Sequence, residues 1–152
     1  MKFSTREDTD IPADVLFDSI SNFARAEKLL IRRGASVRRI DPSQEPGAGM
    51  AWLVGFDWRG KRRELRLDVV QFDRPERLSI AGMADSYQIR LDMTVIALTR
   101  QKSRLIVETE VRPRNMRARL VLQTAKLGKS QLDQRYAKQI SKYIQEMTDS
   151  RA

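Results

Sequence analysis

The side chains that could carry chemistry in this chain are few, because it contains neither histidine nor cysteine. Without histidine the chain lacks the usual general base near neutral pH and the commonest metal ligand. Without cysteine, disulfides and thiolate metal sites are excluded. The sequence also has no glycine-rich phosphate loop, zinc pattern or nucleophile elbow. We therefore expect no metal or redox cofactor, and no set of catalytic residues emerges.

The polar side chains that alternation and helical spacing turn toward the interior are Gln71, Tyr87, Thr109, Tyr136 and Tyr143. General acid–base catalysis needs titratable groups that are aimed into a site. In the expected register no carboxylate falls on the inner face of residues 50–99. We interpret the five polar residues as groups satisfied at the wall or rim of a cavity.

Glu108 and Glu110 look like paired carboxylates, but a spacing of two puts both on the outer face of a strand. Arg6 of the first strand is placed to neutralise them, so we interpret this pair as structural.

Arg63 is turned inward beside Phe56 by the expected hairpin register. At a cavity mouth it could hold a ligand carboxylate or phosphate through two parallel hydrogen bonds. The interpretation that we favour is that the hairpin tip projects beyond the covering helix. Arg63 would then lie in water and rest on the indole of Trp58.

The elements expected before residue 50 are a strand over 2–10, a helix opened by Pro12, a helix over 24–33, a strand over 35–41 and a turn-rich connection over 42–49. Asp10 or Ile11 is the expected cap of the first helix, because proline favours the first helical position. Gly34 suits a left-handed cap at the end of the second helix.

From residue 50 to 112 apolar and polar residues alternate, which is typical of an antiparallel meander with one buried face. A cavity between that face and a covering helix would be lined by Trp52, Phe56, Trp58, Arg63, Leu67, Ile80, Tyr87, Leu91, Met93, Thr109, Leu127 and Tyr136. The alternative is that the apolar members of this set simply form a filled core.

Two short loops, residues 59–60 and 85–86, are expected to act as two-residue hairpin turns, the first because glycine accepts a positive φ. They pair Trp58 with Lys61, Phe56 with Arg63, Asp57 with Arg62, Ala84 with Tyr87, and Ile80 with Leu91.

The last hairpin leaves two registers in which inward residues lie opposite each other. One sets Asp92 opposite Arg112. The other sets Asp92 opposite Glu110 and Arg90 opposite Arg112. We expect the first, because like charges directly opposite destabilise a sheet.

One amphipathic helix over residues 115–147 is expected to close the chain. Gly128 interrupts it, at a cost of roughly 1 kcal/mol relative to alanine. We expect this glycine to let the helix approach the sheet closely, the alternative being that it makes room for a ligand. The apolar stripe of the helix consists of Met116, Leu120, Thr124, Leu127, Leu132, Tyr136, Ile140, Tyr143 and Met147.

The formal net charge of +9 is concentrated in residues 112–142, which carry nine Lys/Arg against Asp133 alone. A solvated helix face is the simplest interpretation. The alternative is contact with an anionic membrane surface, an acidic protein or RNA. RNA is disfavoured, because recognition of unpaired bases needs stacking aromatic residues and this segment offers just Tyr136. The cations available for such contact are Arg117, Arg119, Lys126, Lys129, Lys138 and Lys142.

A chain of 152 residues is expected to form one domain, 1–152, that is large enough to bury a core. Its composition, 41% hydrophobic and 32% charged, is that of an ordinary globular protein. No apolar stretch has the length of a membrane span, and the acidic start lacks a secretory signal. The expected location is the cytoplasm.

The order of strand, two short helices, six strands and a long helix resembles the START-like (SRPBCC) superfamily. Residues 11–18 (IPADVLFD), with Ile20 and Phe23, are similar to that family's entry into its first helix. Residues 69–78 (VVQFDRPERL) are similar to its proline-containing turn after the fourth strand. The resemblance implies an α+β helix-grip fold, in which a curved antiparallel sheet of about seven strands wraps around the C-terminal helix.

The function expected from these observations is binding of a hydrophobic or amphipathic small molecule, lipid-like or polyketide-like, by a carrier or sensor. The ligand would lie between the sheet and the C-terminal helix. A polyketide cyclase/dehydrase is the alternative that the resemblance implies, and it would need two polar groups converging in the cavity. A third alternative is a module whose basic helix docks on an anionic membrane, RNA or a protein partner.

Overall fold

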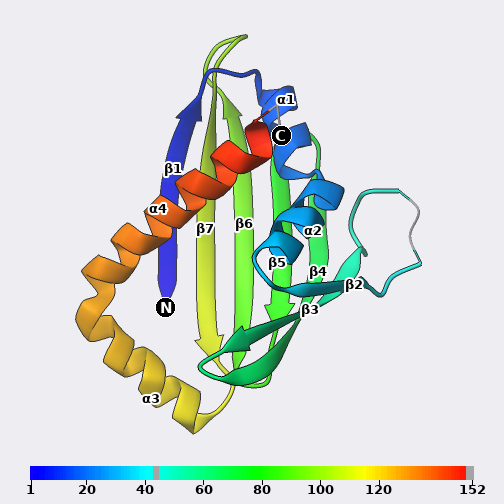
Figure 1. Ribbon diagram of the computed structural model, residues 1–152. Coiled ribbons are helices and arrows are strands. Elements are labelled where there is room, and N and C mark those ends of the chain that lie inside the picture. The colour runs from blue at the N-terminus through cyan, green and yellow to red at the C-terminus, as the bar shows by residue number, and fades with distance from the viewer. Residues whose placement is uncertain (43–44, 150–152) are drawn as a thin grey trace.

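The computed structural model describes residues 1–42 and 45–149 (Figure 1). Its elements are β1 (Lys2–Thr9), α1 (Ala13–Ile20), α2 (Phe23–Arg32), β2 (Ser36–Arg39), β3 (Ala51–Trp58), β4 (Lys61–Asp73), β5 (Arg77–Met83), β6 (Tyr87–Ala97), β7 (Ser103–Pro113), α3 (Met116–Ala125), the 3₁₀ turn η1 (Lys126–Gly128) and α4 (Lys129–Thr148). The seven strands form one antiparallel sheet in the order β1-β7-β6-β5-β4-β3-β2.

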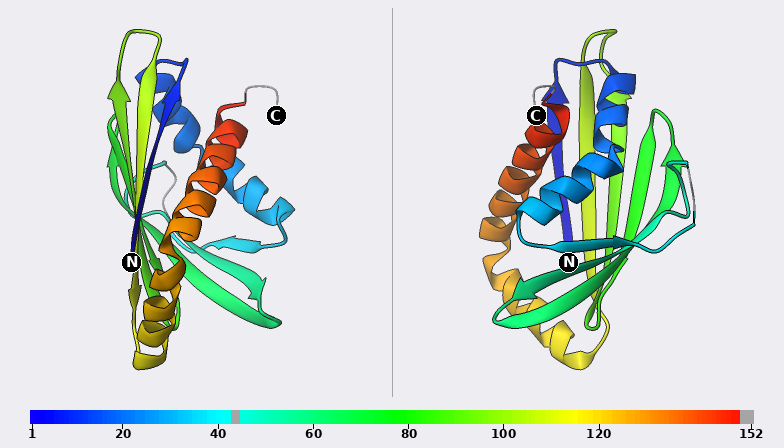
Figure 2. Two further views of the ribbon diagram at one scale, coloured as in Figure 1. Left: turned by 90° about the vertical axis from the view of Figure 1, so that its left-hand side faces the viewer. Right: turned by 45° about the vertical axis from the view of Figure 1, so that its right-hand side comes forward.

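The helices α1, α2 and α4 lie on one face of this sheet, and α4 crosses it diagonally (Figure 1). The hairpin of β3 and β4 curls out of the plane of the other strands toward the helical side (Figure 2). This is the curved sheet around a C-terminal helix that the sequence predicts.

The core fills the end of the inner face where α1 and α4 meet the sheet, the upper end in Figure 1. Helix α1 contributes Leu16 and Phe17, neither of which has exposed surface, and α4 contributes Ile144 and Met147. From the sheet they meet Trp52, Val54, Val69, Leu78, Met93, Val95, Leu105 and Val107, all at most 5% exposed. Burial of each Leu-sized side chain is worth roughly 1.5–3 kcal/mol, so this end supplies most of the stability.

Local signals explain where several elements begin and end. The Asn22 side chain accepts a hydrogen bond from the Arg25 backbone N–H at 3.1 Å and so caps α2. Gly34, just past that helix, has a φ of +94°, as predicted for a left-handed cap. For α1 the expected cap is wrong by one or two residues, because Pro12 itself occupies the capping position.

The first two hairpin registers are confirmed. The loop at residues 59–60 has a positive φ at both positions, 52° and 72°, as a two-residue hairpin turn requires. The confirmed pairs are Trp58 with Lys61, Phe56 with Arg63, Asp57 with Arg62, Ala84 with Tyr87, and Ile80 with Leu91.

Both candidate registers of the last hairpin are wrong. Asp92 lies opposite Glu108, while Arg90 lies opposite Glu110. The like-charged pair is tolerated because Asp92 finds its partners elsewhere. It accepts a hydrogen bond from Ser79 Oγ on β5 at 2.5 Å, and the guanidinium of Arg90 lies 3.3 Å away.

A β-bulge in β4 between Val69 and Gln71 shifts the pairing with β5. The residues after the bulge therefore point to the opposite side of the sheet from the one expected. The expectation that Gln71 points inward is therefore wrong. Its side-chain amide bonds the carboxylate of Asp73 at 2.6 Å, and Phe72 takes the inward position instead.

We predict that Asp92→Asn makes the protein less sensitive to acid. Burial raises the pKa of Asp92, but the hydrogen bonds from Ser79 and Arg90 and the charges of Arg90 and Arg77 outweigh it, so the pKa lies below its usual 3.8. A lowered native pKa contributes stability above pH 3.8 that is lost as the pH falls through the native pKa. Urea unfolding between pH 7 and pH 2 should show a shallower acid limb for the variant.

The matched control is Asp85→Asn in the exposed β5–β6 turn, which should reproduce the acid limb of the parent protein. Equal acid sensitivity of Asp92→Asn and the parent would mean that Asp92 does not contribute to the loss of stability at low pH.

The predicted closing helix is divided into α3 and α4 by the turn η1. Gly128 ends that turn, and no heavy atom lies within 4 Å of the point where a Cβ would sit. The expected close approach of this glycine to the sheet is therefore wrong.

Candidate functional site

The inner face of the sheet changes character toward its lower end in Figure 1. Below the core, the apolar side chains of β3 to β7 are only partly buried instead of fully packed. We call this set the lower inner face: Phe56, Leu65, Leu67, Ile80, Tyr87, Ile89, Leu91 and Val111. Solvent-accessible apolar side chains lying side by side on a sheet form a surface that an apolar ligand can cover.

The predicted cavity wall is divided between this face and the core. Leu67, Ile80 and Leu91 pack against the edge of the core while keeping some exposed surface, and Phe56 and Tyr87 lie on the lower inner face. Trp52 and Met93 are each 5% exposed and belong to the filled core. The expected enclosed chamber is therefore corrected: side chains fill the upper end of the inner face, and the lower end is partly open.

The inward polar pair is Thr109 of β7 and Tyr136 of α4, whose hydroxyl oxygens lie 2.8 Å apart. The Tyr136 hydroxyl is also 3.3 Å from the Val107 carbonyl, and its ring stacks on Phe3 at 5.2 Å. Burial raises the pKa of the Tyr136 phenol, so it stays protonated at neutral pH. This pair can donate a hydrogen bond to a ligand oxygen, but it offers no base.

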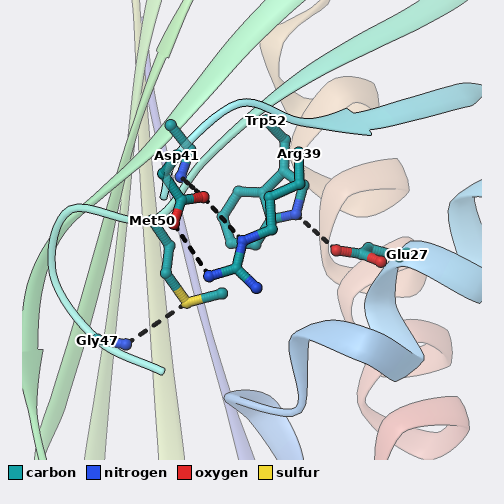
Figure 3. A network of polar contacts seen from close by, with 7 residues as sticks. Glu27, Arg39, Asp41, Gly47, Met50 and Trp52 are labelled. Carbon is teal, nitrogen blue, oxygen red and sulfur yellow. Dashed lines mark hydrogen bonds and ion pairs between the residues drawn. The ribbon is translucent and has the colours of Figure 1, made fainter. Parts of the chain in front are cut away.

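A second polar contact joins α2 to the sheet, and sequence reasoning missed it. The indole N–H of Trp52 donates to the Glu27 carboxylate at 2.7 Å (Figure 3). The Phe23 ring lies 5.2 Å from the same indole. Residues four apart share a helix face, so the spacing of Phe23 and Glu27 was the available signal. Glu27 acts as an anchor here, because its carboxylate is engaged by the indole.

Beside this contact, Arg39 forms two hydrogen bonds to the Asp41 carboxylate, at 2.8 and 3.0 Å (Figure 3). Asp41 also accepts from the Ala51 backbone N–H at 3.0 Å, which ties the connection after β2 to the start of β3. The hydrogen bonds that Arg39 donates to Asp41 raise the pKa of Arg39. This cluster holds the sheet edge in place.

Three predicted wall residues lie at the rim or outside it. The Trp58 side chain is 55% exposed at the β3–β4 tip, and Arg63 is exposed, as the interpretation that we favoured requires. The guanidinium over the Trp58 indole belongs to Arg59, at 5.7 Å, while Arg63 Nε approaches the Trp58 carbonyl at 3.5 Å. Leu127 is 89% exposed, because the turn η1 carries it away from the sheet.

Tyr143, which we expected on the inner side, is partly buried, and burial raises its pKa to about 12. The paired outer carboxylates differ from expectation in the residue that neutralises them. Glu110 accepts a hydrogen bond from Arg112 Nε at 2.6 Å, so its partner is Arg112. Arg6, the expected partner, lies opposite Ile106.

Five of the six basic residues singled out on the closing helix are exposed: Arg117, Arg119, Lys126, Lys138 and Lys142. Lys129 is half-buried, pairs with Asp133, and has its ammonium 4.5 Å from the centre of the Phe3 ring. It is therefore the one least able to contact a partner.

Two depressions of the described surface lie mainly outside the lower inner face, which shares Ile89 with the second of them. One is formed by Leu29, Arg32, Arg33, Glu146 and Asp149 between α2 and the end of α4. The other lies across β5, β6 and β7 around Arg90 and Arg112. Among the described residues no three acidic side chains gather as a metal site would need. None of the described helices is long and apolar enough to cross a membrane.

No family model and no curated protein matches the chain. Solved structures do match it. A norcoclaurine synthase point mutant of Thalictrum flavum, in complex with a transition state analogue, covers 96% of this chain and 94% of its own, with a TM-score of 0.66 and 14% identity. A START superfamily protein of Mycobacterium smegmatis covers 91% and 98%, with a TM-score of 0.56 and 14% identity.

An aromatase/cyclase of a Streptomyces species covers 76% of this chain and 69% of its own, with a TM-score of 0.60 and 12% identity. The agreement spans the seven strands and the C-terminal helix that grips them. The chain has the helix-grip fold. At such low identity the likeness concerns the fold alone, and the helix-grip scaffold hosts both binding proteins and enzymes.

Proposed function

We propose that this helix-grip protein binds a hydrophobic or amphipathic small molecule on the lower inner face, as a carrier or sensor. The observation that carries the proposal is the change along one sheet face from fully buried apolar residues to partly exposed ones. Full burial of a Leu-sized side chain is worth roughly 1.5–3 kcal/mol, so the partly exposed side chains of this face give up part of that stabilisation and stay accessible to a ligand.

The shape of the ligand follows from the polar groups beside the apolar surface. The hydroxyls of Thr109 and Tyr136 satisfy each other and can turn toward one ligand oxygen. Cations lie at the rim, where the exposed Arg63 could meet an acidic head group in water. An elongated or polycyclic apolar body with one or two oxygens fits this arrangement. The neighbouring START superfamily and aromatase/cyclase structures support the general class.

We predict that Leu91→Gln raises the Kd for a fluorescent fatty acid about tenfold, because an amide would have to be desolvated on the apolar face. Leu91 is half-buried on β6 and faces inward opposite Thr109. Titration of parinaric acid fluorescence measures the change.

The matched control is Ile106→Gln, because Ile106 is also half-buried but points to the outer face of β7. It should bind the fatty acid like the parent protein. Equal loss in both variants, or no loss in either, would count against the lower inner face. Native mass spectrometry of freshly purified protein would then identify the natural ligand by its mass.

A further inference from the structure

Helix α3 is apolar on two opposite sides, although only one of them meets the sheet. Ala118, 2% exposed, packs the inner side toward β7. On the outer side of α3 Met116 is 67% exposed and Leu120 57%, and in the adjoining turn η1 Leu127 is 89% exposed. Met116 and Leu120 are four residues apart and lie on one side of α3, and Leu127 follows them in η1. We call these three residues the outer stripe of α3.

Cations border the outer stripe on both sides. At 100° per residue, Arg117 projects on one side of it and Arg119 and Lys126 on the other. All three are exposed. No aspartate or glutamate occurs from residue 111 to residue 132, so nothing along α3 neutralises them.

We propose that the outer stripe of α3 docks on an anionic phospholipid bilayer, with the helix lying in the plane of the interface. An apolar line flanked by Lys/Arg is the arrangement of interfacial helices, whose apolar side chains enter the acyl boundary while cations meet lipid head groups. The surface lies outside the lower inner face, so the docking proposal does not depend on small-molecule binding.

Other occupants fit the same observations less well. A second copy docked through this stripe would bring Arg117, Arg119 and Lys126 of both chains together, because a twofold interface repeats the same patch. The core of a protein interface is usually depleted of charge. A single-stranded RNA would need stacking platforms, and α3 carries no aromatic residue.

Flotation with vesicles of equal parts phosphatidylcholine and phosphatidylserine tests the proposal. The parent protein should bind these vesicles, lose binding as salt rises, and leave vesicles of pure phosphatidylcholine free. The double variant Arg117→Gln/Arg119→Gln should partition onto the vesicles roughly 25-fold more weakly, because each cation near an anionic surface raises the affinity roughly fivefold. Leu127→Gln should weaken it about tenfold.

The matched controls lie in the β6–β7 loop at the opposite end of the sheet (Figure 1). Leu98 is 42% exposed and Arg100 is exposed, so Leu98→Gln and Arg100→Gln change the same chemistry elsewhere. Both controls should keep full vesicle binding. Leu127 is so exposed that its substitution cannot unpack the core, and unchanged urea unfolding verifies this.

Three results would overturn the proposal. One is equal binding to neutral and anionic vesicles. The second is a loss of binding in the Leu98 or Arg100 variant as large as in the α3 variants. The third is a Leu127→Gln variant that binds vesicles like the parent while sedimentation shows that it no longer self-associates, which would assign the stripe to a second copy.

Discussion

Phe17→Ala is expected to lower the free energy of unfolding by about 3–5 kcal/mol, a large fraction of the 5–15 kcal/mol of a typical domain. The Phe17 side chain has no exposed surface, and its ring meets the edge of Phe72 at 5.4 Å. The guanidinium of Arg74 lies 5.5 Å from both ring centres, so it covers the pair from the solvent side. Urea unfolding followed by circular dichroism measures the loss.

Val15→Ala is the matched control, because Val15 lies on the same helix and is 45% exposed. Its effect should stay within about 0.5 kcal/mol. A loss below about 1 kcal/mol for Phe17→Ala would mean that α1 does not pack tightly against the upper end of the sheet.

The second large effect is expected at Trp52, where alanine should cost about 3–5 kcal/mol. Trp52 is 5% exposed, contacts the Phe23 ring, and donates its indole N–H to Glu27. Alanine removes the ring and also leaves the carboxylate of Glu27 without this donor. Trp52→Phe keeps an aromatic ring in the same place and should cost about 1–3 kcal/mol, mainly for the lost hydrogen bond.

Trp58→Ala shows whether the two tryptophans of the chain contribute differently to stability. The Trp58 side chain stands at the β3–β4 tip and is 55% exposed, so we expect a change within about 0.5 kcal/mol. Equal losses in the Trp52 and Trp58 variants would contradict the assignment of one tryptophan to the core and the other to the rim.

The parts of the fold that the sequence predicts well are those controlled by neighbouring residues. The turn at Arg59 and Gly60 sets the register of its hairpin, because a two-residue turn fixes which residues of the two strands lie opposite each other. Apart from the bulge in β4, the alternation of inner and outer residues from 50 to 112 follows from the period of a strand. The left-handed φ of Gly34 follows from the ease with which glycine adopts that conformation.

The parts that sequence reasoning misses depend on residues distant along the chain. The like-charged pairing of Asp92 with Glu108 is tolerated because Ser79 of the neighbouring strand bonds Asp92, and a comparison of two strands leaves that partner out. The bulge after Val69 reverses the facing of Gln71, and one extra residue in a strand has no marker in the alternation. The turn η1, which was also missed, divides the single expected helix into α3 and α4 and leaves Leu127 exposed.

The candidate site shows the same division. The sequence identified the apolar inner residues and brought Thr109 and Tyr136 to the same side, and the structure places their hydroxyls in contact. It could not tell which apolar residues the helices cover, because coverage depends on the path of α4 across the sheet (Figure 2). Leu67 and Met93 are alike in the sequence pattern, yet Leu67 is partly exposed and Met93 is buried.

The contrast between the packed upper end of the sheet and its partly open lower end has a consequence for redesign. Positions such as Phe56, Ile89 and Leu91 contribute less burial than Leu78 or Leu105, so randomising them should seldom unfold the protein. A library confined to those strand positions would vary what the scaffold recognises while its fold is maintained from the other end. New small-molecule receptors could be selected from such a library.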